Sequence, residues 1–265
     1  MDVRRLLVSP RVVSVEGTAE RADDDRPVRV LMTKDGGLVG FDRLDTTVTH
    51  LRRSPLPAEY RERRTTLDTV YPAVRWRLSD DRLTLVEQHV MGSPSSAWGG
   101  ADRIELLRRL LREGAARAEK TPDRRPMLDA SSRSELPSSP RWHDLRVADA
   151  ALGPVPWLMS HGDLTPENVI GRGPDAWAPI DFEDARPTPF FYDPLSLAVR
   201  DRTLRATLVS GDVDEEWTGL VRAAGLDPQV LTPQIALDAV ALIAAVHHHR
   251  EHRGDLGYTL RSLTQ

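Results

Sequence analysis

A β-hairpin pattern late in the chain restricts its folding more than any other feature. Two short runs suited to strands, Val169–Gly171 and Trp177–Ile180, flank the turn-forming residues 172–175. Glycine and proline at such a place favour a tight turn, so we expect the two runs to pair as a hairpin. Closing the hairpin brings Asn168, which precedes the first run, beside Asp181, which follows the second.

Asp163 lies five residues before Asn168, on the loop that leads into the hairpin. It can therefore face the same side as Asn168 and Asp181 without competing for a cation. Amide and carboxylate oxygens suit a hard divalent cation such as Mg²⁺. Phosphoryl transfer needs such a set: one carboxylate orients the attacking hydroxyl, while an Asn and a second Asp hold metal against the phosphates.

These residues lie in a segment that reads SHGDLTPENVI over 160–170 and IDFEDA over 180–185. The segment resembles the catalytic loop and the metal-binding strand of the aminoglycoside phosphotransferase and choline kinase-like superfamily. The sequence YDPLSLA at 192–198 is similar to the Asp-Leu-Ala element that this superfamily carries further along. The resemblance is strongest over residues 157–199.

The resemblance implies a role for each matched residue. Asp163 would be the catalytic base or the residue that orients the hydroxyl, and His161 would support its loop. Asn168 and Asp181 would bind Mg²⁺, and Glu183 would assist the metal directly or through water. The spacing of Asp163 and Asn168 equals that in the protein-kinase catalytic loop. The resemblance implies ATP as the phosphoryl donor, although the sequence does not distinguish ATP from GTP.

The first third of the chain differs from the rest in its secondary-structure pattern. Strand patterns fall at Arg11–Glu16, Val28–Met32, Leu38–Phe41, Thr46–Leu51 and Leu83–Met91, with one helix expected over 54–70. Helical patterns follow at 101–119, at 142–151 and from 232 onward, with an irregular proline- and serine-rich loop at 120–140. We therefore predict an α+β protein with a bilobal protein kinase-like fold, in which a small β-rich N-lobe spans 1–91 and a larger helical C-lobe spans 92–265.

The N-lobe of a kinase holds the nucleotide phosphates with a lysine on its third strand, paired with a glutamate on a helix. The candidates for the cation are Lys34, which is the only lysine among the first 119 residues, and Arg43, Arg52 and Arg53. Arginine keeps the charge, but its planar guanidinium is not equivalent to a compact ammonium. The candidates for the carboxylate are Glu59 and Glu62.

Residues 85–92 (LVEQHVMG) resemble the strand-to-hinge segment between the lobes of the same superfamily. Backbone groups near Glu87 and His89 would then bind the edge of the adenine. An edge strand that ends at Gly92 explains these residues equally well, so both interpretations stay open.

Composition excludes several classes of function. The 265 residues include no cysteine, which removes thiolate nucleophiles, iron–sulfur clusters and cysteine zinc sites. A net charge of -4 gives no reason to expect nucleic acid as a partner. The longest apolar run, Ala239–Val246, is far shorter than the ~20 residues that cross a bilayer, and no secretory signal is evident. We expect a cytoplasmic protein without a membrane partner.

The pattern as a whole predicts an ATP-dependent phosphotransferase that acts on a hydroxyl of a small molecule, such as an aminoglycoside-like compound or an amino alcohol. Two alternatives stay open. The acceptor would be a Ser or Thr of a peptide if the chain acts with a lyase partner in modified-peptide biosynthesis. The chain would instead be a pseudokinase, a binding module that keeps the fold, if the missing lysine means that nucleotide is not used.

Overall fold

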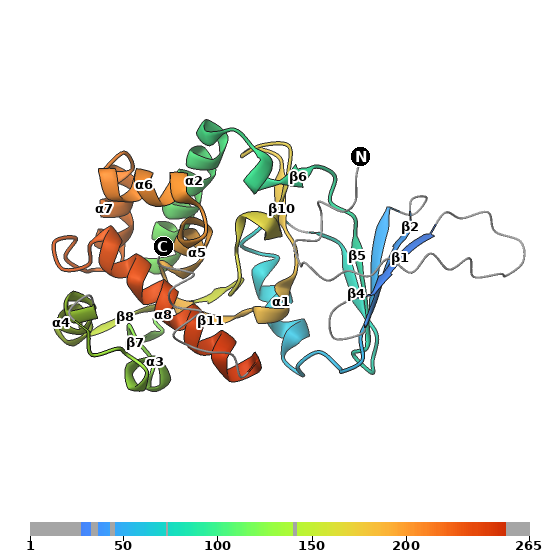
Figure 1. Cartoon of the computed structure of the whole chain (residues 1–265), viewed down its shortest axis with the longest axis horizontal. Coiled ribbons are helices and arrows are strands. Elements are labelled where there is room, and N and C mark those ends of the chain that lie inside the picture. The colour runs from blue at the N-terminus through green and yellow to red at the C-terminus, as the bar shows by residue number, and fades with distance from the viewer. Residues whose placement is uncertain (1–27, 33–36, 43–45, 73, 140–141, 253–265) are drawn as a thin grey trace, which may run out of the picture.

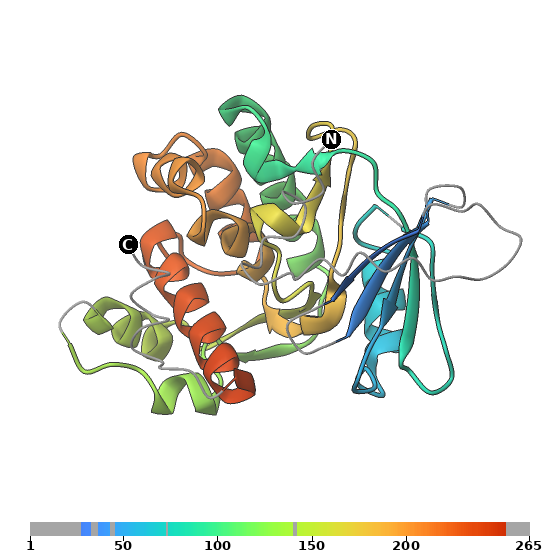
Figure 2. The same cartoon turned by 45° about the vertical axis from the view of Figure 1, so that its right-hand side comes forward.

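The computed structural model describes residues 28–32, 37–42, 46–72, 74–139 and 142–252. The predicted strand Arg11–Glu16 and the candidate cations Lys34 and Arg43 lie outside these residues. The described chain forms a β-sheet half and a larger, mainly helical half, which lie side by side in Figure 2. The predicted mixed fold with two lobes is therefore confirmed.

A single antiparallel sheet forms the smaller half, with its strands in the order β1-β2-β3-β5-β4 (Figure 1). Its strands are β1 Val28–Met32, β2 Leu38–Asp42, β3 Thr47–Leu51, β4 Trp76–Leu78 and β5 Thr84–Gln88. Four of the five strand patterns read from the sequence appear here, because β-branched and aliphatic side chains suit a half-buried pleated surface.

Helix α1, Tyr60–Leu67, lies between this sheet and the helical half (Figure 1). The prediction that it begins at Ser54-Pro55 is wrong. Leu56 is buried, and its backbone N–H donates to the Arg82 carbonyl in the β4–β5 turn at 3.0 Å. That bond holds the preceding segment against the sheet, so the helix begins later.

The larger half is built around α5, whose eight residues Tyr192–Val199 are all buried. A helix that is apolar on every side belongs in the centre of a fold. α8 packs against α5, and α2 packs against both α5 and α7. The helices of this half are α2 Gly100–Ala118, α3 Ala130–Ser134, α4 His143–Ala151, α5, α6 Arg202–Ser210, α7 Asp214–Ala223 and α8 Pro233–His252.

Two small antiparallel sheets, in the orders β10-β9-β6 and β11-β8-β7, complete this half. Their strands are β6 Ser93–Pro94, β7 Arg124–Pro126, β8 Pro154–Ser160, β9 Val169–Gly171, β10 Trp177–Pro179 and β11 Arg186–Pro189. The prediction of an irregular loop over 120–140 is wrong in part, since β7 and α3 lie within it. β7 is an edge strand, where proline costs no hydrogen bond in the sheet.

The chain passes from one half to the other between Gln88, where β5 ends, and Ser93, where β6 begins. This crossing lies where the sequence places the lobe boundary, although the extents 1–91 and 92–265 stay predictions. Within the described ranges, every helix is too short or too polar to cross a bilayer.

Candidate active site

The predicted hairpin is present. β9 and β10 pair in antiparallel fashion with Val169 opposite Pro179, and the Ile180 N–H donates to the Asn168 carbonyl at 2.9 Å. This last bond extends the pairing to Ile180, the residue immediately before Asp181. The hairpin therefore brings Asn168 and Asp181 together, as the sequence predicts.

Asn168 also connects directly to Asp163. Its side-chain Nδ2 donates to the Asp163 backbone carbonyl at 2.9 Å and to Asp163 Oδ2 at 3.1 Å. The amide nitrogen is thus used within the loop, which leaves the Oδ1 oxygen to accept from a donor or to bind a cation. The other carboxylate oxygen of Asp163 lies 3.6 Å from the Arg200 guanidinium at the end of α5.

Asp181 has a backbone conformation that few non-glycine residues adopt, with φ 64° and ψ 67°. Such left-handed geometry costs free energy and persists where the surrounding structure imposes it. Asp181 is exposed to water, although many protein atoms surround its carboxylate. This partial loss of water, with the nearby carboxylates of Asp163 and Asp184, raises the pKa of Asp181.

A Mg²⁺ ion fits this set of donors. Mg²⁺ is usually held by one or two protein carboxylates together with substrate phosphates and water, so one Asp and one Asn oxygen suffice. Burial and the nearby carboxylates of Asp163 and Asp184 raise the pKa of Asp181, and a bound cation would favour its ionised form. Across the described ranges, no group of three or more His, Cys, Asp or Glu side chains forms an all-protein metal site.

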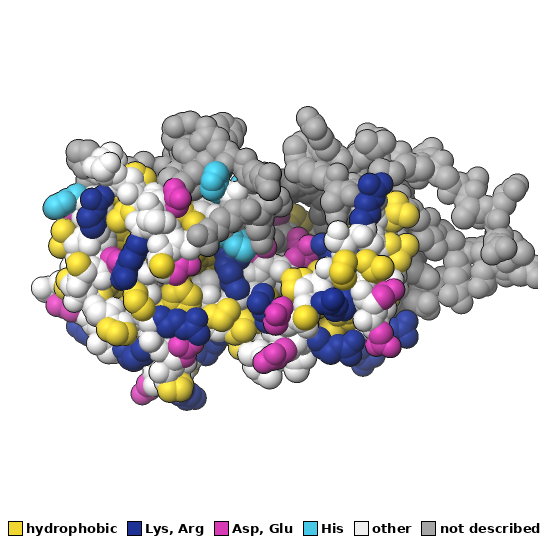
Figure 3. Space-filling view, turned by 90° about the horizontal axis from the view of Figure 1, so that it is seen from below, with side chains coloured by type: hydrophobic (Ala, Val, Ile, Leu, Met, Phe, Trp, Pro, Cys, Tyr) yellow, Lys and Arg dark blue, Asp and Glu magenta, His cyan; other side chains and the backbone are white. Residues whose placement is uncertain are grey.

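Glu183, predicted to assist the metal, forms an ion pair with Arg52. Arg52 follows β3 and Glu183 follows Asp181, so this pair joins the two halves of the protein. Arg63 of α1 adds a second connection by donating to the Ala185 carbonyl at 2.9 Å. The ion pair uses Glu183 Oε1, so a metal bound by Glu183 would share this carboxylate with Arg52. Figure 3 shows acidic and basic side chains gathered where the halves meet.

Asp193 of α5 fixes the loop that carries Asp163. Its buried carboxylate accepts from the backbone N–H groups of His161 at 2.8 Å and Gly162 at 3.3 Å, and from the Tyr71 hydroxyl at 2.5 Å. The fully buried His161 ring is 2.8 Å from the Ile180 carbonyl through Nε2. His161 therefore joins the loop to the hairpin, which agrees with a supporting role.

Gly162 is the residue of this loop that tolerates substitution least. Its φ is +85°, and a Cβ atom there would collide with the Asp184 backbone carbonyl. We expect Gly162→Ala to lower the free energy of unfolding by more than about 2 kcal/mol, measured by urea denaturation. Gly153→Ala is the matched control, because its φ is +64° and a Cβ there meets open space. Equal losses in the two variants would contradict the proposed collision.

The structure corrects the prediction for the helix carboxylate. Glu59 and Glu62 are both exposed, so neither supplies an inward-facing carboxylate for the nucleotide site. Arg64 is the charged residue of α1 that turns inward, with only 1% of its surface exposed. It pairs with Glu87 of β5 at 3.3 Å.

Two backbone N–H groups of the hinge segment, residues 85–92, already donate hydrogen bonds within the protein. The N–H of Gln88 donates to the Arg75 carbonyl at 2.7 Å, and the N–H of His89 donates to the Thr46 carbonyl at 2.6 Å. The His89 ring packs edge-on against Phe41, with ring centroids 6.2 Å apart. Binding of an adenine edge by this segment stays a prediction and requires other backbone groups.

Four ionisable residues that the structure brings to this region were not predicted from the sequence: His50, Arg64, Asp193 and Arg200. Asp193 lies in the YDPLSLA element, so its place in a matched motif was a usable signal. Arg200 comes directly after the last residue of the same helix, α5. Nothing in the sequence distinguishes Arg64 from the other arginines of α1.

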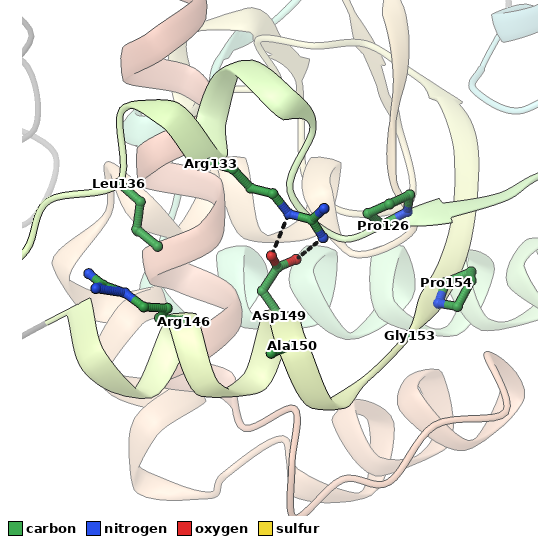
Figure 4. Close-up of a pocket in the computed structure, with 8 residues that line it drawn as sticks. All are labelled: Pro126, Arg133, Leu136, Arg146, Asp149, Ala150, Gly153 and Pro154. Carbon is green, nitrogen blue, oxygen red and sulfur yellow. Dashed lines mark hydrogen bonds and ion pairs between the residues drawn. The ribbon is translucent and has the colours of Figure 1, made fainter.

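A separate hollow of the helical half lies between α3, α4 and the start of β8 (Figure 4). Its volume is about 680 Å³, and the Arg133–Asp149 ion pair lies across it with nitrogen–oxygen distances of 2.7 and 3.2 Å. None of its lining residues belongs to the Asp163 loop or to the hairpin.

A five-stranded sheet with one helix, a helical half, and an Asp-Asn-Asp set on a loop and hairpin between them define a kinase-like phosphotransferase. A family model described as the phosphotransferase enzyme family matches residues 38–226. The chain belongs to this family, because the match spans more than half of its length.

Solved structures support the same fold. The chain is similar to macrolide 2'-phosphotransferase from Brachybacterium faecium, with 15% identity, 96% of this chain and 90% of that chain covered, and a TM-score of 0.52. It is also similar to a choline kinase from Streptococcus pneumoniae, with 14% identity, 98% and 95% covered, and a TM-score of 0.50. No curated protein sequence matches the chain. At these identities the likeness establishes the fold.

Proposed function

We propose that this protein transfers the γ-phosphoryl group of ATP to a hydroxyl of a small molecule, in the presence of Mg²⁺. The observation that carries the proposal is the convergence of Asp163, Asn168 and Asp181, in which Asn168 donates to Asp163 and the hairpin places Asp181 beside it. Membership of the phosphotransferase family supports the reaction class. The acceptor is an aminoglycoside-like compound or an amino alcohol in this proposal.

The geometry gives each side chain a task. Asp163 accepts the proton of the acceptor hydroxyl while the hydroxyl oxygen forms a bond to the γ-phosphorus. The bond from that phosphorus to the bridging oxygen breaks, and ADP leaves with the electron pair. Asn168 holds Asp163 in place through Nδ2. Arg200, 3.6 Å from Asp163, adds positive charge where the phosphoryl oxygens would gather.

Asn168 and Asp181 would hold the Mg²⁺, with Glu183 as a further ligand whose carboxylate is shared with Arg52. The ion supplies compensation for the charge of the phosphates. Asp181 is exposed to water, so its carboxylate is accessible to a metal ion and to the phosphates that the ion would hold. The protein contributes positioning and charge more than covalent chemistry.

A screen of acceptors tests the proposal. The full chain is incubated with ATP, Mg²⁺ and panels of aminoglycosides, macrolides, amino alcohols and Ser/Thr peptides, and products are identified by mass spectrometry. A phosphorylated small molecule supports the proposal. A phosphorylated peptide instead supports the peptide-kinase alternative. A wild-type chain that binds no ATP–Mg²⁺ in calorimetry contradicts both and leaves the pseudokinase alternative.

Asp181→Asn should separate nucleotide binding from stability. We expect the Mg²⁺-dependent affinity for ATP to fall about tenfold or more, because a charged metal ligand is lost. The Tm of the unliganded chain should rise instead, since the charge repelled by Asp163 and Asp184 is removed and Asn tolerates a positive φ. Calorimetry and thermal unfolding measure the two effects. Unchanged ATP affinity would exclude Asp181 as a metal ligand.

A further inference from the structure

His50 is the basic residue of β3 that faces α1. In the β3–β5 register, Val48 lies opposite Glu87 and His50 lies opposite Leu85, so His50 and Glu87 lie diagonally on one face of the sheet. His50 Nε2 is 3.4 Å from Glu87 Oε2, and about a third of the His50 side chain is exposed. His50 therefore belongs to a row of contacts that continues through Glu87 to Arg64 of α1.

Glu87 is the residue that His50 and Arg64 both contact. Only 8% of its surface is exposed, and a buried carboxylate is tolerated only when it is paired. Its Oε2 faces His50, and its Oε1 lies 3.3 Å from the Arg64 Nη1. Glu87 thus joins the third strand of the sheet to the helix behind it.

Arg64 extends the connection to the Asp181 segment. Its guanidinium lies over the Phe182 ring, 3.5 Å from the ring centroid, and its Nε donates to Asp68 at 3.1 Å. Phe182 follows Asp181 directly and packs against the His161 ring, with centroids 4.6 Å apart. Arg64 therefore limits how far the Asp181 backbone can move.

The same region holds more hydrogen-bond donors than the described protein satisfies. Arg64 Nη2, Arg52 Nε and the Tyr60 hydroxyl are buried without a hydrogen-bond partner. Burial raises the pKa of Tyr60, with Glu87 as the next cause. Buried donors without partners are rare. The region between the sheet and α1 therefore has fewer hydrogen-bond acceptors than donors.

We infer that His50 is the phosphate-contacting residue of the nucleotide site, and that Glu87 and Arg64 position it in place of the usual lysine–glutamate pair. The inference rests on the proposed function. In the usual arrangement the carboxylate comes from the helix and pairs with a lysine on β3. Here the carboxylate comes from β5, the helix supplies a cation, and β3 supplies an imidazole. Each element therefore carries a different type of side chain from the usual one.

Calorimetric titration of the full chain with ATP–Mg²⁺ tests the role of His50. We expect His50→Ala to weaken binding about tenfold, the usual effect of losing one hydrogen bond to a charged group. His50→Lys should bind as tightly as wild type or more tightly, because an ammonium on β3 restores the usual contact. His143→Ala, an exposed histidine on α4, is the matched control and should bind like wild type.

The role of Glu87 is tested by a double-mutant cycle. If Glu87 acts through His50, the pair His50→Ala/Glu87→Gln should bind ATP–Mg²⁺ no more weakly than His50→Ala alone. Additive losses would overturn the positioning role. A cooperative thermal unfolding transition above the assay temperature shows that the Glu87 variant is folded, with Glu119→Gln, an exposed residue that follows α2, as the control substitution.

Different results would overturn the proposed function and the role of His50. Wild-type binding together with unchanged binding by His50→Ala overturns this inference and leaves the proposed function standing. Absence of ATP–Mg²⁺ binding by the wild-type chain overturns the proposed function, and the assignment of His50 with it.

Discussion

Asp163→Asn should reduce phosphoryl transfer by about 10²–10⁴-fold, the range expected when a catalytic base is removed. The amide has the shape of the carboxylate and can still accept from Asn168 Nδ2, so the loop should keep its geometry. It cannot accept the proton of the acceptor hydroxyl. The rate is measured as ADP formed in the presence of the acceptor panel, with the variant and wild type at equal concentration.

The affinity for ATP–Mg²⁺ should be nearly the same in Asp163→Asn and wild type, because Asp163 faces the acceptor and not the metal in the proposed arrangement. This separates it from Asp181→Asn, which should lose affinity. Asp175→Asn, an exposed acid in the β9–β10 turn, is the control for the substitution itself and should leave turnover unchanged. Full turnover by Asp163→Asn would refute its assignment as the base.

The parts of the site that the sequence predicts are those made by neighbours in the chain. A turn and two short strands are local features, and they place Asn168 beside Asp181 without help from the rest of the protein. The position of Asp163 can be predicted as well, because it is only five residues before Asn168 and the loop between them is short. The strand patterns of the sheet half are recovered for the same reason, since alternation is read over a few residues.

The parts that the sequence misses depend on contacts between distant segments. The start of α1 is set by a bond from Leu56 to Arg82, in a turn that follows β4. The role of Glu87 is set by His50 on one strand and Arg64 on the helix. Exposed glutamates on α1 look better suited to a kinase-like pairing, and only the packing of the helix shows that Arg64 turns inward.

The arrangement of His50, Glu87 and Arg64 bears on whether the chain is an enzyme or a pseudokinase. The absence of a β3 lysine favours a binding module only if nothing replaces it. His50 lies on the same strand, β3, and contacts the buried carboxylate of Glu87, so in the proposed arrangement it takes the place of the lysine. The Asp163 loop and the hairpin are complete as well, which favours an active phosphotransferase.

Asp193→Asn should be the most damaging change away from the reacting groups, with a loss of about 3 kcal/mol in the free energy of unfolding. The carboxylate accepts from two backbone N–H groups of the Asp163 loop and from the Tyr71 hydroxyl. An amide offers one oxygen and turns its NH₂ toward groups that are themselves donors. Urea denaturation measures the loss, and Asp144→Asn, on the exposed face of α4, is the control.

Tyr71→Phe shows whether that loss comes from the shared carboxylate. Tyr71 supplies one of the three donors, so its removal should cost about 1 kcal/mol. Once Asp193 is already Asn, the Tyr71 hydroxyl has lost its acceptor, and removing it should cost less than in wild type. Because Asp193 holds the loop that carries Asp163, its variant should also lose turnover without contacting substrate. A stable Asp193→Asn variant with normal turnover would mean that the loop keeps its position by other contacts.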